Sequence, residues 1–290
     1  MKIAHILEFV FQEISYCGST INVQLNYVDR LPKADDNNSF NKASIASYQA
    51  QRYWIPWTEE LGAWISNDGL QVTILVTEDA KTSEIAGCLT LGLTSVITGA
   101  CLSLQNQVAI HANAVSINSQ AVAFVGHSGK GKSTLSTYCA SRGCGFVTDD
   151  VLVVNDEGLT YPGNPRIKLY SHTADCLGLA GGKETEYKTF FEPEQLGAKL
   201  HDTLVPLSII YLLAEDSTEI YSEKLSPSNA LFELLPHSYY AYDLIKIYPE
   251  LFDAYTDLIQ QASVRRLYYP RDFAMLPQVY RFLVEEVAQL

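Results

Sequence analysis

Short hydrophobic runs, separated by glycine, proline and asparagine, make up the first third of the chain. Runs of this length, bounded by turn-forming residues, are typical of β-strands rather than helices. The predicted strands are residues 3–14, 20–28, 53–55, 63–65 and 70–76, with a polar loop over 31–44. Four aromatic residues on or beside these strands are expected in a core: Tyr53, Trp54, Trp57 and Trp64. The pattern predicts a small β-rich N-terminal region.

Residues 85–104 carry no charge over a length that could cross a bilayer. Glycine, serine and threonine dilute this segment, however, and no basic cluster flanks it, as one usually does beside a membrane span. We therefore predict a helix buried against a sheet, and no membrane association. This helix would connect the β-rich region, residues 1–105, to a second domain over residues 106–290.

Strand and helix patterns alternate in the second domain. The predicted strands are residues 108–114, 115–117, 121–125, 145–148, 151–154, 166–170, 207–213 and 220–225. One predicted helix follows residue 134, a second begins at Pro227 with Ser226 as its cap, and a third begins at Pro249. A fourth helix ends the chain and has a core-facing stripe of Val279, Phe282, Leu283 and Val287. The alternation predicts an α/β fold, with a mixed sheet flanked by helices.

The net charge of the chain narrows the classes of partner. The 290 residues are 47% hydrophobic and carry a net charge of −13. Nucleic acids and anionic membranes select basic surfaces, so neither is an expected partner. The six cysteines show no C-x-x-C or zinc-binding spacing, and the start of the chain is too polar for a secretory signal. We therefore expect a cytoplasmic protein with reduced thiols.

One motif indicates the chemistry. Residues 126–134, which read Gly-His-Ser-Gly-Lys-Gly-Lys-Ser-Thr, fit G-x-x-x-x-G-K-[ST], the phosphate loop of P-loop NTPases. A hydrophobic strand before the motif and an amphipathic run after it supply the context that the motif requires. Backbone N–H groups of the loop and the helix N-terminus would bind the phosphates of ATP. The predicted nucleotide-binding residues are Gly126, His127, Ser128, Gly129, Lys130, Gly131, Lys132, Ser133 and Thr134.

Within this loop, Lys132 would reach the β- and γ-phosphates, and the Ser133 hydroxyl would bind Mg²⁺. Two adjacent carboxylates, Asp149 and Asp150, follow the hydrophobic run 145–148. P-loop folds place a metal-binding carboxylate at the carboxyl end of such a strand, beside the phosphate loop. Because side chains alternate along an extended strand, one carboxylate would face the metal and the other the nucleophile.

Two further cations are candidates for contact with phosphate or substrate. Lys188 lies within residues 178–198, a polar, glycine-bearing segment that we predict to be a mobile lid or partner-binding loop. A solvated lysine is the alternative interpretation of Lys188. Arg271 precedes the last helix and would either face the active site or pair with Asp272.

The spacing of residues 111–150 matches that of one known family. His111 stands fifteen residues before Gly126, and five residues separate Arg142-Gly143 from Asp149-Asp150. This run resembles the catalytic domain of bacterial HPr kinase/phosphorylase. It is closest to the broader HPr-kinase-like proteins, some of which phosphorylate peptides in ribosomal-peptide biosynthesis. The segment Tyr269-Pro270-Arg271-Asp272 also resembles this group.

The resemblance implies a P-loop kinase-like fold and a role for each matched residue. Asp150 would accept the proton of the acceptor hydroxyl, with His111 beside the nucleophile, while Lys132 holds phosphate. Asp149 would then bind the metal together with Ser133. The resemblance also suggests a homo-oligomer. The sequence departs from the family at His127, where the family has an acidic residue, and the N-terminal 100 residues do not resemble the regulatory domain of the full enzyme.

These residues together predict an ATP-dependent, Mg²⁺-requiring kinase whose acceptor is a hydroxyl, in the first place a serine of a peptide or protein. Two alternatives use the same residues. One is a kinase of a free amino acid or sugar, and the other is a nucleotide-binding regulatory module without catalysis. The sequence has no N-K-x-D run of the kind that recognises guanine, which favours ATP over GTP as the bound nucleotide.

Overall fold

The structure, a computed structural model, describes residues 13–17, 19–32, 47–49, 52–80, 88–89, 92–184, 188–201 and 203–290. The chain forms two compact units. One contains Met1–Gln107 and Tyr239–Leu251, and the other contains Val108–Ser238 and Phe252–Leu290. The strand predicted over residues 3–14 and the loop predicted over 31–44 lie mostly outside the described residues.

The first unit is built on a six-stranded sheet with the order β1-β2-β6-β5-β4-β3. Its strands are β1 (Glu13–Tyr16), β2 (Ser19–Val28), β3 (Ser47–Gln49), β4 (Arg52–Pro56), β5 (Leu61–Ser66) and β6 (Gln71–Thr77). Strands β2 and β6 run parallel, and the other neighbouring pairs run antiparallel. The rings of Trp54 and Trp64 pack with centroids 5.2 Å apart, and Tyr53 and Trp54 are fully buried. The predicted β-rich N-terminal region is confirmed.

The described part of the uncharged segment is helical. It consists of a π-helical turn, η1 (Leu93–Ile97), followed by α3 (Thr98–Leu104), whose seven residues are all buried. The returning segment, which contains α7 (Ala241–Leu244), packs on α3, where Ser103 Oγ donates a hydrogen bond of 2.6 Å to the Tyr239 carbonyl oxygen. In the part of the chain that the structure describes, no helix is long and apolar enough to cross a membrane.

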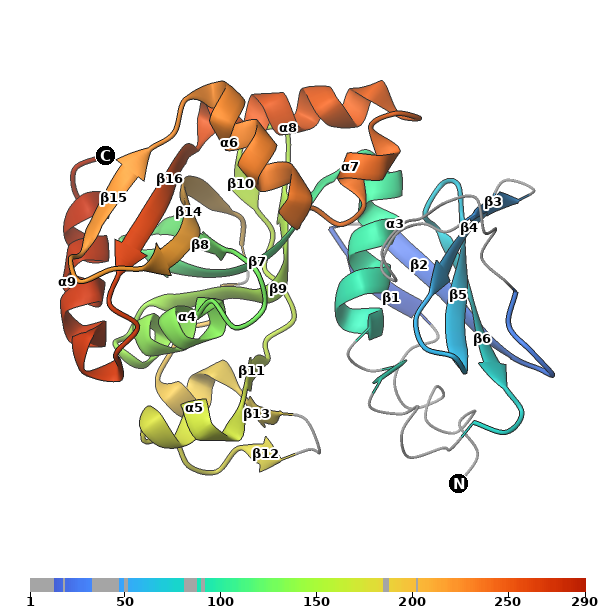
Figure 1. Cartoon of the computed structure of the whole chain (residues 1–290), viewed down its shortest axis with the longest axis horizontal. Helices are drawn as coiled ribbons and strands as arrows, with labels where there is room; N and C mark the ends of the chain where they lie inside the picture. The colour runs from blue at the N-terminus through green and yellow to red at the C-terminus, as the bar shows by residue number, and fades with distance from the viewer. Residues whose placement is uncertain are drawn as a thin grey trace. The chain divides into compact units, whose positions relative to one another are not determined.

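The second unit contains a seven-stranded mixed sheet with the order β10-β9-β7-β8-β14-β16-β15 (Figure 1). Its strands are β7 (Val108–Ile117), β8 (Gln120–Val125), β9 (Gly145–Val154), β10 (Leu159–Thr160), β14 (Val205–Asp216), β15 (Tyr221–Lys224) and β16 (Ser263–Tyr269). Strands β8, β14 and β16 run parallel to one another, whereas β7 runs antiparallel to both β8 and β9. Strand β10 pairs with β9 and also with β14.

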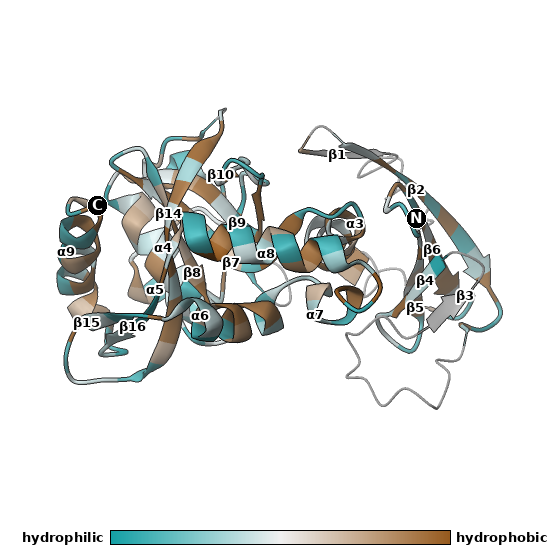
Figure 2. Ribbon diagram, turned by 90° about the horizontal axis from the view of Figure 1, so that it is seen from above, coloured by the Kyte–Doolittle hydropathy of each residue, from teal (hydrophilic) through white to brown (hydrophobic). Residues whose placement is uncertain are grey.

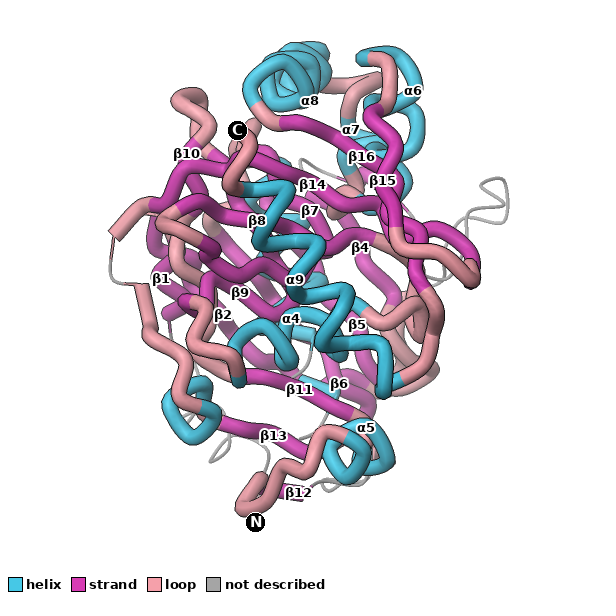
Figure 3. Tube along the Cα trace, turned by 90° about the vertical axis from the view of Figure 1, so that its left-hand side faces the viewer, coloured by secondary structure: helices cyan, strands magenta, loops and turns pink. Residues whose placement is uncertain are grey.

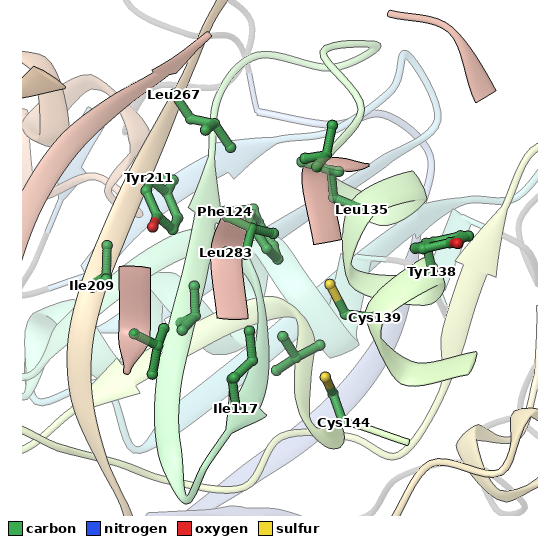
Figure 4. Packing of buried hydrophobic residues seen from close by; sticks show 14 of the residues in the cluster. Ile117, Phe124, Leu135, Tyr138, Cys139, Cys144, Ile209, Tyr211, Leu267 and Leu283 are labelled. Carbon is green, nitrogen blue, oxygen red and sulfur yellow. The ribbon is translucent and has the colours of Figure 1, made fainter. Parts of the chain in front are cut away.

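Helices cover both faces of this sheet, as the α/β prediction requires. Helices α4 (Lys132–Ser141) and α9 (Leu276–Val287) pack on one face and enclose a core that includes Phe124, Tyr211 and Leu283 (Figure 4). Figure 3 shows α9 crossing the strands, and Figure 2 shows its separate hydrophobic and hydrophilic sides. Helices α6 (Pro227–Leu234) and α8 (Pro249–Gln261) lie on the opposite side in Figure 1. Tyr255 of α8 donates a hydrogen bond of 2.9 Å to the Ala109 carbonyl oxygen.

A small third sheet, β11-β13-β12, adjoins the second unit's main sheet. It consists of β11 (Ile167–Leu169), β12 (Lys183–Glu184) and β13 (Thr189–Phe191), and α5 (Ser171–Cys176) and the 3-10 turn η2 (Pro193–Leu196) flank it. Ile167, Phe191 and Ala174 form its hydrophobic cluster, together with Ala140 of α4. The segment predicted as a loop over 178–198 therefore contains two strands and a 3-10 turn in its described part.

Two further differences from the sequence prediction affect the site. Strand β9 is continuous, so Asp149 and Asp150 lie inside it and not at its carboxyl end. The sequence predicts two strands over residues 108–117, whereas the structure has the single strand β7. Because β7 pairs with β9 along almost this whole length, β9 continues past both carboxylates. The sequence also does not predict β16, because Arg265 and Arg266 interrupt its hydrophobic run.

Two 3-10 turns, η3 (Leu235–His237) and η4 (Phe273–Met275), complete the unit.

Candidate active site

The phosphate-loop motif has the strand–loop–helix context that its sequence predicts. The loop joins β8 to α4, and Gly129 and Gly131 adopt φ angles of 82° and 93°, which favour glycine. A Cβ on Gly131 would lie 2.8 Å from the Tyr269 hydroxyl oxygen and 3.2 Å from the Arg271 guanidinium. The backbone conformation therefore favours glycine at residue 131, and an added Cβ would also displace the ends of the Tyr269 and Arg271 side chains.

The Lys132 ammonium lies inside the curve of its own loop. Its Nζ atom donates hydrogen bonds to the carbonyl oxygens of Gly126 at 2.6 Å and His127 at 3.4 Å. Lys132 is only 7% exposed, and burial lowers its pKa, although the nearby Asp150 charge acts in the opposite direction. A buried cation whose hydrogen bonds go to carbonyl oxygens is well placed to bind an anion in the loop.

Arg271 contacts the loop backbone. One guanidinium nitrogen donates to the Lys130 carbonyl oxygen at 2.5 Å and also to the Tyr269 hydroxyl, and the other donates to the Ala214 carbonyl oxygen at 2.5 Å. The guanidinium lies 4.0 Å from the centroid of the Tyr269 ring. These contacts tie the loop to the ends of β14 and β16. The predicted contact of Arg271 with substrate stays a prediction.

Asn113, in the middle of β7, connects the loop helix to the carboxylates. Its Nδ2 atom donates to the Ser133 and Ser136 hydroxyls, each at 3.3 Å, and to Asp149 Oδ1. The register of β7 with β9 places Asn113 opposite Asp149. The Ser133 hydroxyl and the Asp149 carboxylate therefore converge on one amide. The sequence prediction omits Asn113, although a lone amide inside a hydrophobic strand is a detectable signal.

The two carboxylates have different environments. Asp149 is 4% exposed, and burial, followed by the Asp150 charge, raises its pKa to about 8. Asp150 is more accessible, with 24% of its side chain exposed, and it forms an ion pair with the Lys168 ammonium. Asp149 contacts Asn113, and Asp150 contacts the Lys168 ammonium. That one carboxylate faces the metal and the other the nucleophile stays a prediction.

Lys168 of β11 holds both carboxylates. Its backbone N–H donates to Asp149 Oδ2 at 2.7 Å, and its ammonium donates to Asp150 Oδ2. The Lys168 side chain is 9% exposed. The sequence indicates only a cation in a short strand, so the role of Lys168 becomes visible only when β11 is placed beside β9.

His111 lies on β7 two residues before Asn113 and close to the same charges. Burial, followed by the Lys132 charge, lowers the pKa of His111 to about 4, against the opposing effect of Asp150. The imidazole is therefore uncharged at neutral pH. The Lys188 charge also lowers the pKa of His111. The Lys188 ammonium lies 5.2 Å from the ring centroid of Tyr170.

A third histidine, which the sequence prediction omits, lies between His111 and the loop. Ser238 forms an antiparallel bridge with Ile110, which brings His237 opposite His111. The ring centroids of His237 and His127 are 4.9 Å apart. Burial, followed by His127 and Lys132, lowers the pKa of His237 to about 4.

The residues present fit a magnesium ion. Ser133 and Asp149 supply a hydroxyl and a carboxylate that already share one hydrogen-bonding partner. Among the described residues, no group of three acidic, histidine or cysteine side chains could hold a metal by itself. Mg²⁺ usually takes only one or two protein carboxylates and completes its shell with water and substrate phosphates. Ser133 and Asp149 are the residues that would hold it.

Two pockets flank the phosphate loop. One, of about 380 Å³, is lined by Gly131, Thr134 and Phe273, and the other, of about 500 Å³, is lined by Gly126 and His127. A larger pocket of about 800 Å³ opens at the starts of β8, β14 and β16, at the opposite edge of the sheet. Open α/β sheets bind ligands at the carboxyl ends of their parallel strands, so the two smaller pockets belong to the site.

No protein-family model and no curated protein matches this sequence. Among solved structures, the chain is similar to the Hpr(Ser) kinase/phosphatase from Coxiella burnetii, at 13% identity over 62% of this chain and 97% of that chain. The TM-score of 0.35 describes a loose likeness, and nothing about the reaction follows from it. The chemistry of the site has to be inferred from its own residues.

Proposed function

We propose that this protein is an ATP-dependent, Mg²⁺-requiring kinase that transfers the γ-phosphate to the hydroxyl of a serine in a peptide or protein. One observation carries the proposal: Asn113 joins the phosphate-loop helix to Asp149, which places the Asp149–Asp150 pair beside the loop. A phosphate-binding loop, a metal-binding carboxylate and a proton acceptor are the parts that phosphoryl transfer requires.

The loop would bind the phosphates through its backbone N–H groups and the start of α4. The Lys132 ammonium would exchange its carbonyl partners for oxygens of the β- and γ-phosphates. The pocket beside Thr134 and Phe273 would take the nucleoside. When bound at Ser133 and Asp149, Mg²⁺ would neutralise charge on the phosphates. Positioning and charge neutralisation account for most of the catalysis in reactions of this class.

Asp150 would accept the proton of the acceptor hydroxyl. As the acceptor oxygen bonds to the γ-phosphorus, the bond from that phosphorus to the β–γ bridging oxygen breaks, and ADP leaves with the electron pair. The proton moves to a carboxylate oxygen of Asp150, which is the more exposed member of the pair. His111 is uncharged because burial lowers its pKa to about 4, and its one ring N–H could donate a hydrogen bond to the acceptor oxygen while the hydroxyl proton points toward Asp150.

The test uses purified protein, Mg²⁺, ATP labelled at the γ-phosphate, and serine-containing peptides. Label should pass to peptide serine with the wild-type protein. Label on a free amino acid or sugar in a metabolite extract, and none on peptides, would instead support a small-molecule kinase. ATP binding without transfer to any acceptor would contradict the proposal and favour a regulatory module.

A further inference from the structure

The pocket of about 500 Å³ lies on the His127 side of the phosphate loop. It is bounded by the start of the loop, the ends of β14 and β16, and the segment from α6 to η3. Its lining includes Gly126 and His127 of the loop and His237 of η3, and also Phe232 of α6 and Tyr268 of β16. All of these residues belong to the second compact unit.

This pocket opens at the γ-phosphate end of the loop. The ammonium of a phosphate-loop lysine reaches the β- and γ-phosphates, so its position marks that end of the nucleotide. Lys132 Nζ donates a hydrogen bond to the carbonyl oxygen of Gly126, and Gly126 lines this pocket. Thr134 lines the pocket of about 380 Å³ on the other side of the loop. In-line transfer requires the acceptor to approach the γ-phosphate opposite the leaving ADP. The pocket beside Gly126 is therefore on the acceptor's side.

The side of the pocket that His237 lines adjoins the catalytic cluster. The bridge between Ile110 and Ser238 sets His237 opposite His111, and the Lys132 charge acts on both imidazoles. The ring of His127 packs against His237 at 4.9 Å. An acceptor hydroxyl beside His237 would lie near His111, on which the Asp150 charge also acts.

The cations that line the pocket already have acidic partners. Lys130 Nζ forms an ion pair of 2.6 Å with Glu215, and the Arg266 guanidinium binds both carboxylate oxygens of Glu233. An anionic small molecule, such as a free hydroxy acid or a sugar phosphate, would have to break one of these pairs to be held by its charge. The lining thus favours an acceptor without charge next to its hydroxyl.

Two aromatic residues, Phe232 and Tyr268, line the pocket away from the loop. Phe232 is 74% exposed, and Tyr268 stacks on Tyr221 with ring centroids 4.5 Å apart and an angle of 9° between the planes. Exposed aromatic rings at the rim of a pocket are typical of sites that bind another polypeptide. A pocket of about 500 Å³ also holds more than the single side chain that carries the hydroxyl.

We propose that this pocket binds the polypeptide segment that carries the acceptor serine, with an apolar side chain adjacent to that serine packed against Phe232 and Tyr268. This inference rests on the proposed kinase function and adds to it the side of approach and a sequence preference of the acceptor.

The experiment compares four serine peptides that differ only in the two residues flanking the serine. Both flanking residues are leucine in the first peptide, alanine in the second, aspartate in the third and lysine in the fourth. Binding is measured by fluorescence anisotropy of end-labelled peptide, in the presence of a non-hydrolysable ATP analogue, and transfer is measured separately with ATP. We expect the leucine peptide to bind about tenfold more tightly than the aspartate peptide, as burial of one apolar side chain would give.

The Phe232→Ala substitution should remove this preference and leave the affinity for ATP unchanged. Phe252→Ala is the matched control, because Phe252 is also an exposed phenylalanine, at 41%, but does not line the pocket. Binding of the leucine peptide that depends on Phe232, without any transfer, would contradict only the proposed kinase function. Equal affinities for the four peptides, an affinity unaffected by Phe232→Ala, or no peptide binding at all would overturn the inference.

Discussion

At the scale of single residues, Lys168 connects the two carboxylates most directly. Its backbone N–H binds Asp149 and its ammonium binds Asp150, so one residue fixes the positions of both. We predict that Lys168→Met lowers kcat by about 10- to 100-fold, because Asp150 loses its partner and its position. The affinity for ATP should change by less than about threefold, since the loop residues are untouched. Steady-state kinetics and calorimetric ATP titration measure the two effects.

Lys168→Arg is the control for this prediction. It keeps the positive charge and should recover part of the lost kcat, although its planar guanidinium cannot reproduce the geometry of an ammonium. If Lys168→Met and Lys168→Arg both retain the wild-type kcat, the ion pair between Lys168 and Asp150 has no role in catalysis.

Which residues could be identified from the sequence depends on how far apart they lie along the chain. Lys132 and Ser133 are part of a contiguous motif, and His111 and Asp150 stand at fixed distances from it. The sequence does not indicate three further residues of the cluster, which are Asn113, Lys168 and His237. Asn113 reaches the site through the pairing of β7 with β9, and His237 through the bridge between Ile110 and Ser238. Lys168 reaches it through contacts of a separate sheet with the two carboxylates. A local pattern encodes none of these.

The burial of His237 predicts a dependence of stability on pH. Burial lowers the pKa of His237 from 6.5 to about 4, with His127, Lys132 and His111 as its charged or titratable neighbours. A pKa that is lower in the folded state gives stability that is present above pH 6.5 and is lost as the pH falls toward 4. The melting temperature of the wild type should therefore fall across this pH window, and the melting temperature of the His237→Gln variant should fall less.

Differential scanning calorimetry between pH 7 and pH 4.5 provides this measurement. His172→Gln controls for the substitution itself, because it makes the same change at an exposed histidine. An identical slope in His237→Gln and the wild type would mean that His237 titrates normally in the folded protein.

At the scale of elements, the two ends of α4 offer a matched pair of glycines. Gly131 begins the helix with a φ of 93° and lies against Tyr269 and Arg271, whereas Gly143 follows the helix with a φ of 90° and open space around it. We predict that Gly131→Ala lowers ATP affinity at least tenfold, because an added Cβ would displace the loop from its contacts. Gly143→Ala should cost only about 1 kcal/mol of stability. Equilibrium binding and urea unfolding separate the two effects.

Gly143→Ala also serves as the control for general damage to α4. The Gly143 and Cys144 N–H groups donate to the Ala140 and Cys139 carbonyl oxygens at 3.0 and 3.2 Å, which is the pattern of a Schellman helix end. Equal loss of ATP affinity in both variants would show that the loop contacts of Gly131 are not specific to nucleotide binding.

The elements predicted best are those with a strong local pattern. The hairpin of β7 and β8, the loop and α4 follow from a hydrophobic strand, a glycine-rich turn and a helical repeat. Strand β16 and the continuity of β9 do not follow, because both depend on pairing with a neighbour. Two arginines interrupt the hydrophobic run of β16, and two aspartates interrupt that of β9. Charged residues inside a strand become interpretable only when their partners are known.

At the scale of the whole molecule, the chain returns to its first unit through Tyr239–Leu251. No hydropathy signal separates this segment from its neighbours, so the sequence does not predict the return. Gly99 of α3 faces the Tyr239 ring, and a Cβ there would lie 2.2 Å from it. We predict that Gly99→Val destabilises the protein by about 1–3 kcal/mol through overpacking, measured by urea unfolding.

A double-mutant cycle checks this contact. Tyr239→Ala removes the ring that the valine would meet, so the double variant should be more stable than the sum of the two single effects predicts. Strict additivity of Gly99→Val and Tyr239→Ala would show that this segment does not pack on α3 as described.

The measurement that tests the central claim most directly is a single-turnover transfer experiment. Wild-type protein and the Asp150→Asn variant are each saturated with γ-labelled ATP and Mg²⁺ and mixed with a serine peptide, and phosphoserine is followed by rapid quench. We predict equal ATP affinities and a transfer rate at least about 100-fold lower in Asp150→Asn, because its amide cannot accept the hydroxyl proton. Equal transfer rates for the two proteins, or no phosphoserine from a wild-type protein that binds ATP, would contradict the account.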